Sequence, residues 1–161
     1  IFGHLARVPL RSCDGPWYRK RLAVLSLPVS LPAMTHRFPV RVYYEDTDMG
    51  GIVYPANFLK FIQRARREWV AGLGLDQHAM REAGLVFAVR RIEAEYLRPA
   101  RFADDLEVRT RIVSAMGARL VLDQQVWRGG EVLFTAQVTI AAMSAAGRPV
   151  RLPDALRRFQ G

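Results

Sequence analysis

The chain has 161 residues, a formal net charge of +9 and an apolar fraction of 50%. This length fits one domain with a single core, and no apolar run is long enough to cross a membrane, so we expect no membrane span. The positive charge could suit nucleic acid, an anionic lipid surface or the phosphates of a substrate, but no aromatic and basic motif accompanies it, so we do not expect nucleic-acid binding.

The cysteine and histidine residues limit the kinds of active site that the chain can form. Cys13 is the only cysteine, which prevents an internal disulfide and is compatible with a reducing compartment, so we expect a cytoplasmic location. His4, His36 and His78 do not have a metal-ligand spacing, and the chain has no Ser-His-Asp order. We therefore expect neither a metal nor a cofactor.

Residues 1–33 differ from the rest because they show no sustained hydrophobic period. Segment 22–31 is apolar like part of a signal peptide, but Pro28 interrupts it and no clear cleavage site follows. A segment without an apolar face cannot offset its ordering entropy. We expect a disordered or non-native extension here and a domain over 34–161, so that a chain starting at Met34 keeps its melting temperature and activity.

The first ordered segment changes from the period of a strand to that of a helix. Apolar side chains occupy every second position at Phe38, Val40, Val42 and Tyr44, which predicts a half-buried strand. They then follow the spacing of one helix face at Phe58, Ile62, Ala65 and Trp69. Pro55 suits the first position of this helix because its missing N–H would have no partner there. The pattern predicts a long central helix over about residues 56–72.

The loop between this strand and this helix contains Asp46, Asp48 and the pair Gly50-Gly51. Glycine permits backbone conformations that other residues avoid and lets another molecule approach the main chain. A carboxylate in a loop that faces a helix N-terminus lies near N–H groups that can hold a developing oxyanion. Loop carboxylates also shape turns by accepting hydrogen bonds from nearby N–H groups. The residues alone leave both roles open.

The second half of the chain has the alternation of β-strands. After a short helix over 77–83, capped by Asp76, strands are predicted over about 86–98, 106–112, 119–127 and 131–143, with a short helix over 153–159. One strand, a long helix and four antiparallel strands indicate the α+β class. The second face of the last predicted strand is less polar than a solvated surface, so we expect a second subunit to cover it; this face consists of Leu133, Thr135, Thr139 and Met143.

Two stretches resemble the 4-hydroxybenzoyl-CoA thioesterase-like hotdog family, most closely its Tol–Pal-associated acyl-CoA thioesterases. They are Phe38-Pro39-Val40-Arg41-Val42-Tyr43-Tyr44-Glu45-Asp46-Thr47-Asp48 with its continuation to Glu68, and Glu95-Tyr96-Leu97-Arg98-Pro99-Ala100. The resemblance covers about residues 36–158. It implies a hotdog fold, in which an antiparallel sheet wraps around one long central helix, and an acyl-CoA thioesterase activity.

The resemblance also implies a site. The second Asp of the family's Asp-x-Asp pair is its catalytic carboxylate, which corresponds to Asp48, so Asp46 is expected to be structural. Asp48 would attack the thioester carbonyl or activate a water, while the N–H group of Ala56 or Asn57 polarises the carbonyl. Tyr54 is expected to contact the substrate.

Two residues depart from the family pattern. Pro55 removes a backbone donor at the helix start, and Gln63 stands where the family often has Glu. The missing donor keeps an alternative open, namely a non-catalytic module of the cell envelope that binds acyl-CoA or acyl-carrier protein. A hotdog dehydratase would need a histidine in this region, and none lies between His36 and His78.

The family resemblance further implies a homodimer or homotetramer with equivalent sites at the subunit boundary. Arginine suits the phosphates of CoA, and Arg119 is the only cation of the turn 116–119. The alternative is a solvated turn residue. If Arg119 contacts a phosphate, Arg119→Ala should raise the Michaelis constant and leave turnover nearly intact.

Overall fold

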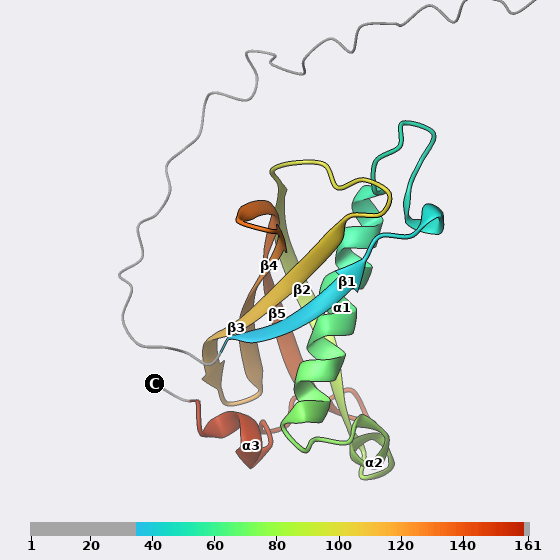
Figure 1. Ribbon diagram of the computed structural model, residues 1–161. Coiled ribbons are helices and arrows are strands. Elements are labelled where there is room, and N and C mark those ends of the chain that lie inside the picture. The colour runs from blue at the N-terminus through green and yellow to red at the C-terminus, as the bar shows by residue number, and fades with distance from the viewer. Residues whose placement is uncertain (1–34, 160–161) are drawn as a thin grey trace, which may run out of the picture. The chain divides into compact units, whose positions relative to one another are not determined.

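The computed structural model describes residues 35–159, so our expectation for residues 1–33 concerns a segment outside the described part. The helices and strands are β1 (His36–Arg41), α1 (Pro55–Gly72), α2 (Gln77–Glu82), β2 (Leu85–Tyr96), β3 (Asp105–Met116), β4 (Arg119–Arg128), β5 (Glu131–Ser144) and α3 (Asp154–Arg157). The five strands form one antiparallel sheet in the order β1-β3-β4-β5-β2. The sheet curls around α1 (Figure 1), which confirms the predicted α+β hotdog fold.

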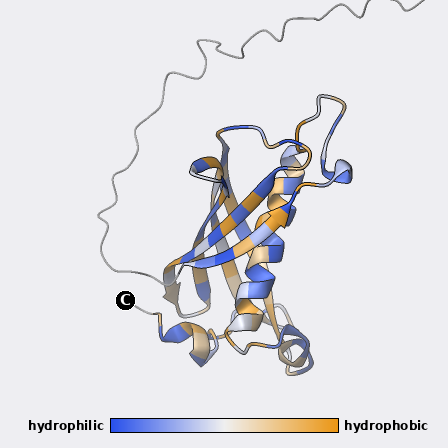
Figure 2. Cartoon of the chain, viewed as in Figure 1, coloured by the Kyte–Doolittle hydropathy of each residue, from blue (hydrophilic) through white to orange (hydrophobic). Residues whose placement is uncertain are grey.

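The core lies between α1 and the sheet. Burial alternates along β1 and β3, and apolar and polar residues alternate along these strands as orange and blue positions (Figure 2). The predicted helix face is confirmed, since Phe58, Ile62, Ala65 and Trp69 are all buried. Their neighbours on the sheet include Val108, Leu122 and Val138. None of the helices within residues 35–159 combines the length and the apolar character that a membrane span needs.

A polar network crosses this core from α1 to the sheet. The Arg66 guanidinium donates from Nη1 to Oε1 of Gln124 at 2.6 Å. The Gln124 Nε2 donates to the Ile62 carbonyl at 3.0 Å and to the Thr110 hydroxyl at 2.9 Å. Because Gln124 is fully buried, these bonds satisfy its amide where water cannot. They fix α1 relative to β3 and β4.

The prediction that Tyr44 belongs to the first strand is wrong. β1 ends at Arg41, and Tyr44 is 83% exposed in a 3-10 turn over Tyr44–Asp46. The turn forms because Asp46 accepts a hydrogen bond from the Tyr43 amide through Oδ2 at 3.0 Å, while its own amide donates to the Tyr43 carbonyl at 3.0 Å. The Asp46 side chain therefore decides the backbone conformation at Tyr43 and Tyr44, although the apolar residues alternate as in a strand.

The prediction that Leu133 lies on the second, outer face of β5 is wrong. Leu133 and Phe134 are both fully buried although they are adjacent in the strand. Val126 pairs with Phe134 but Trp127 pairs with Val132, so Leu133 forms a bulge. Its carbonyl accepts hydrogen bonds from the amides of Leu97 and Arg98, at 2.8 and 3.0 Å. The bulge turns Leu133 into the core, and the second face therefore lacks this residue.

Candidate active site

Asp48 lies half-buried in a tight loop before α1. Its Oδ1 accepts hydrogen bonds from the Gly50 amide at 2.8 Å and from the Ile52 amide at 3.4 Å. Its own amide donates to the Ile52 carbonyl at 2.9 Å. A Cβ added to Gly50 would lie 3.0 Å from Asp48 Oδ1, so this glycine allows the close contact. Within the described residues, Oδ2 has no hydrogen-bond partner, and one carboxylate oxygen is left for chemistry.

Asp46 has a different environment from Asp48. It is buried, and both of its carboxylate oxygens bind chain donors, namely the Tyr43 amide at Oδ2 and the Asn57 Nδ2 at Oδ1, the latter at 3.3 Å. Its carbonyl also accepts from Asn57 Nδ2 at 3.1 Å and from the Tyr54 amide at 3.0 Å. Asp46 therefore ties the loop to the first turn of α1, which is the structural role we expected.

The N-terminus of α1 offers one backbone donor to this site. Pro55 is the first residue of the helix, as predicted, and has no N–H. The Asn57 amide donates to the Tyr54 carbonyl at 2.9 Å. No partner of the Ala56 amide is present in residues 35–159. The sequence suggests two amides that could bind an oxyanion. The Asn57 amide is already hydrogen-bonded, so only the Ala56 amide is available for this role. Tyr54 precedes the helix and is 47% exposed.

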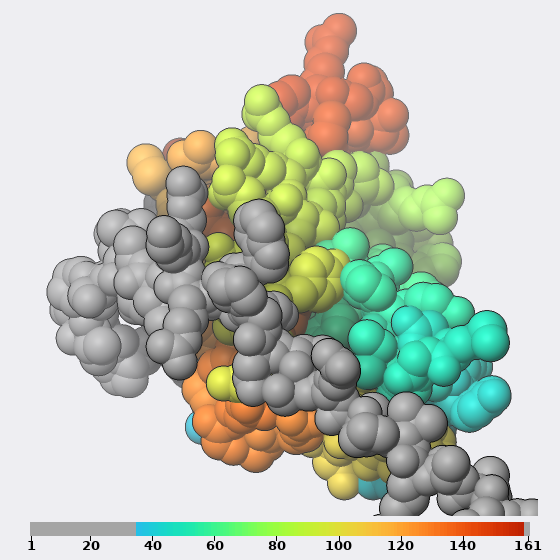
Figure 3. Space-filling view, turned by 90° about the horizontal axis from the view of Figure 1, so that it is seen from above, coloured from blue at the N-terminus to red at the C-terminus, as the bar shows by residue number. Residues whose placement is uncertain are grey.

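The end of β2 forms the wall beside this helix terminus. The Tyr96 hydroxyl donates to the Pro55 carbonyl at 3.1 Å. Its ring packs on Phe58 of α1 and Phe134 of β5, with centroids 5.8 and 5.0 Å away. Figure 3 shows this end of the molecule, with the cyan to green residues of the loop and α1 beside the yellow-green residues of β2. Sequence analysis did not assign Tyr96 a place here, although it lies in the second family-like stretch.

Segment 97–104, which joins β2 to β3, forms backbone contacts with the Asp48 loop. The Val53 amide donates to the Ala100 carbonyl at 2.9 Å, and Ile52 forms a bridge with Arg101. Because Ile52 also holds Asp48 through two backbone groups, the position of 97–104 determines that of the carboxylate.

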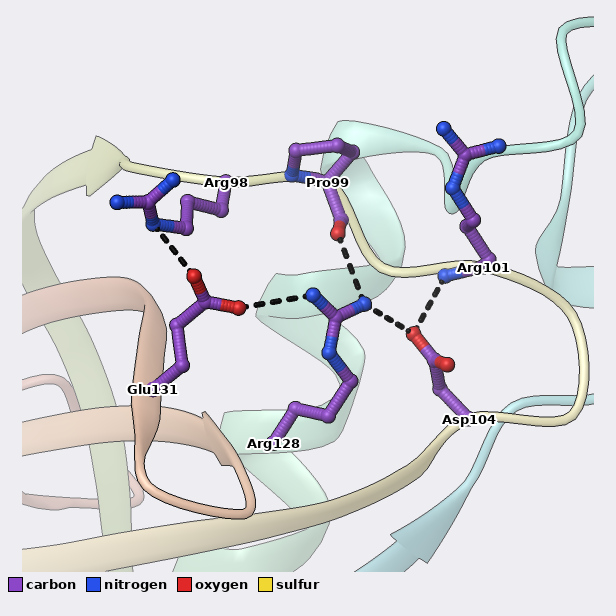
Figure 4. Close-up of polar contacts among 6 residues, drawn as sticks. All are labelled: Arg98, Pro99, Arg101, Asp104, Arg128 and Glu131. Carbon is purple, nitrogen blue, oxygen red and sulfur yellow. Dashed lines mark hydrogen bonds and ion pairs between the residues drawn. The ribbon is translucent and has the colours of Figure 1, made fainter.

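Arg128 at the end of β4 fixes segment 97–104 (Figure 4). It donates to Asp104 Oδ2 at 2.8 Å, to the Pro99 carbonyl at 3.5 Å and to Glu131 at 2.8 Å. Hydrogen bonds to Asp104 and Glu131 raise the pKa of Arg128, so its charge is constant at all working pH values. Arg98 binds the other oxygen of Glu131 at 2.7 Å but not Asp104. Nothing in the local sequence around Arg128 pointed to this role.

Arg119 does not lie with the other candidate residues. Strand β3 begins with Asp105, which pairs with Arg41 near the loop, and ends at Met116, which pairs with Arg119. Since an extended strand of the length of β3 spans about 35 Å, Arg119 lies at the end of the sheet opposite to Asp105. Arg119 and Asp48 of one chain therefore cannot contact the same small group.

The described residues form no metal cluster at Asp48, and two large cavities along α1 do not include this residue. No three His, Cys, Asp or Glu residues within 35–159 are placed to hold a metal ion. A cavity of about 720 Å³ lies at the far end of α1, between Trp69, Leu73 and Ile112. Another, of about 410 Å³, lies along α1 and is lined by Lys60 and Arg64 among others.

Comparison with known proteins finds thioesterases among both the sequence relatives and the solved structures. The family model of the thioesterase-like superfamily matches residues 42–160. The acyl-CoA thioester hydrolase YbgC of Escherichia coli O6:H1 is 38% identical over 122 residues, which are 74% of this chain and 91% of that protein. The acyl-CoA thioesterase YbgC of Haemophilus influenzae is 37% identical over 74% of this chain and 90% of its own length. The crystal structure of a probable thioesterase from Bartonella henselae superimposes with a TM-score of 0.70 at 38% identity, covering 74% of this chain and 99% of that one.

Proposed function

The chain belongs to the thioesterase-like superfamily, as its resemblance predicted, and on this premise we propose that it hydrolyses acyl-CoA thioesters with Asp48 as the catalytic carboxylate. The observation that carries the proposal is the asymmetry of Asp48, whose Oδ1 is held by loop amides while Oδ2 has no partner in the described part. The two YbgC relatives bear the names of acyl-CoA thioester hydrolases, which supports this substrate class.

In the proposed reaction the thioester carbonyl lies over the first turn of α1. The Ala56 amide donates to the carbonyl oxygen, which becomes negative as the carbon becomes tetrahedral. Asp48 Oδ2 either attacks this carbon, forming an anhydride that water then hydrolyses, or removes the proton of an attacking water. In both routes the C–S bond breaks, the CoA thiolate leaves and takes up a proton, and the acyl group leaves as a carboxylic acid.

Thiol release from a panel of aromatic, short-chain and long-chain acyl-CoAs tests this function. We expect saturable turnover of at least one class. A protein that binds acyl-CoA, measured by calorimetry, but releases no thiol from any member would instead be the non-catalytic binding module, for acyl-CoA or acyl-carrier protein. The absent donor at Pro55 is the feature that favours this second candidate.

Arg128 is expected to act on turnover through the loop rather than through the substrate. Arg128→Met removes the bonds to Asp104 and the Pro99 carbonyl and should lower kcat about tenfold, since about 1.4 kcal/mol of misplacement has that effect. KM should change little. Arg111→Met is the matched control, because Arg111 pairs with Asp123 between β3 and β4 and not with segment 97–104. A kcat equally low in Arg111→Met, or a higher KM in Arg128→Met alone, would contradict the positioning role.

We also propose that the protein assembles as a dimer through β2. This strand pairs with β5 on one side and has no partner strand on the other within the described sheet. Its exposed apolar residues include Val89 at 48% and Ile92 at 37%. An unpaired edge of this length is normally covered. Ile92→Glu should therefore yield a monomer in light scattering, whereas a dimer of unchanged mass would exclude this edge.

A dimer of this kind changes the role that we propose for Arg119. Twofold pairing of two antiparallel β2 edges brings the far end of one sheet toward the Asp48 end of the other. The phosphate contact would then come from Arg119 of the partner subunit. Arg119→Ala retains its expected effect on the Michaelis constant, and that effect should disappear in an Ile92→Glu background.

A further inference from the structure

A groove runs along α1 on the side of β2, β4 and β5, and its charged lining has only one sign. The cavity there measures about 410 Å³. Its charged lining residues are Lys60, Arg64, Arg66 and Arg67, and its apolar lining residues are Val70, Phe87, Val89, Leu120 and Ile140. Gln63 and Gln77 complete the lining. No carboxylate contributes to this groove, which is therefore both cationic and partly apolar.

The row of cations begins one helical turn after Ala56, the proposed oxyanion donor. Residues four and three positions apart lie on one helix face, so Ala56, Lys60, Arg64 and Arg67 form one row. With a rise of 1.5 Å per residue, Lys60 lies about 6 Å and Arg64 about 12 Å along the axis from Ala56. A ligand whose carbonyl carbon lies at Ala56 and whose chain follows α1 would meet Lys60 first.

These cations have no acidic partner from the described part of the chain. Lys60, Arg64 and Arg67 are exposed and form no ion pair there. Arg66 is only 8% exposed, and its one side-chain partner is the neutral Gln124. Burial lowers the pKa of Arg66 to about 10, still far above neutrality. A buried charge without a counterion is costly, so an anion bound in the groove would be favoured.

We propose that the acyl group of the substrate ends in a carboxylate, which Lys60 and Arg64 bind in this groove. The inference rests on the proposed thioesterase function and specifies its substrate class, a dicarboxylic acyl group. The phosphates of CoA fit the position of Lys60 less well, because the whole pantetheine arm separates them from the thioester. The methylene groups of the acyl chain would pack on the apolar residues Phe87, Leu120 and Ile140.

Glutaryl-CoA and its ω-amide, which has the same shape without the charge, test the proposal. The wild type should show at least about tenfold higher kcat/KM for the carboxylate, equivalent to about 1.4 kcal/mol. In Lys60→Met and Arg64→Met the ratio of the two kcat/KM values should fall toward one. Both residues are exposed, so the variants should fold normally. Arg81→Met, which removes an exposed cation outside this groove, should keep the wild-type ratio.

The same two acyl groups on pantetheine separate the acyl carboxylate from the nucleotide phosphates. The ratio should persist in these thioesters, which lack the nucleotide. If the variants slow both CoA thioesters equally but neither pantetheine thioester, the groove binds CoA phosphates and the proposal is overturned. Equal hydrolysis of carboxylate and amide by the wild type overturns it as well and leaves the thioesterase function intact. Absence of hydrolysis for every thioester contradicts the function itself.

Discussion

Asp48→Asn is expected to lower kcat for acyl-CoA by about two to four orders of magnitude, since a positioned general base typically contributes a factor of this size. The amide oxygen of asparagine can still accept from the Gly50 and Ile52 amides, so the loop should keep its shape. KM should therefore change little, which steady-state thiol release can measure.

Glu45→Gln is the matched control for this substitution. Glu45 is an exposed carboxylate in the same loop, within the 3-10 turn. Its neutralisation changes the local charge equally but should leave kcat unchanged. Comparable losses in Asp48→Asn and Glu45→Gln would attribute the effect to loop charge instead of to a catalytic carboxylate.

Asp46→Ala is expected to act mainly on stability. It removes the acceptor of the Tyr43 amide and one of the two acceptors of Asn57 Nδ2. Leaving such donors unsatisfied should cost about 2 kcal/mol of unfolding free energy. For a domain of this size the melting temperature should fall by roughly 5–10 °C, measured by calorimetry.

The asparagine variant refines this second prediction. Asp46→Asn keeps one acceptor oxygen and should lose less stability than Asp46→Ala. An Asp46→Ala protein with an unchanged melting temperature and a kcat as low as that of Asp48→Asn would exchange the roles that we assign to the two aspartates.

The elements of the fold could be predicted because their residues carry regular patterns. The helix over Pro55–Gly72 follows from the spacing of Phe58, Ile62 and Ala65 and from the proline at its start. Alternation did not predict the 3-10 turn at Tyr44, because the Asp46 carboxylate and not a sheet neighbour decides it. Nor did it predict the bulge at Leu133, which depends on the register with β4.

The candidate site likewise contains some residues that the sequence indicated and others that it did not. Asp48 and Ala56 lie within one short segment, so loop composition and family resemblance indicated both. Arg128 contacts segment 97–104 from a distant strand, and a sequence does not show which arginine makes such a contact. The position of Arg119 depends on strand order and direction, which place it at the other end of the sheet. The cationic groove likewise appears only when α1 is placed beside β2 and β5.

The most direct test of the central claim, that Asp48 supplies the chemistry of a site that binds intact thioesters, uses the Asp48→Asn protein with stoichiometric acyl-CoA. Binding is measured by calorimetry, and the ligand is then recovered and assayed for the intact thioester bond. We predict saturable binding with the affinity implied by the wild-type KM and recovery of intact thioester after a time in which the wild type has cleaved all of it. Recovery of free CoA and carboxylic acid from Asp48→Asn at the wild-type rate would contradict the claim.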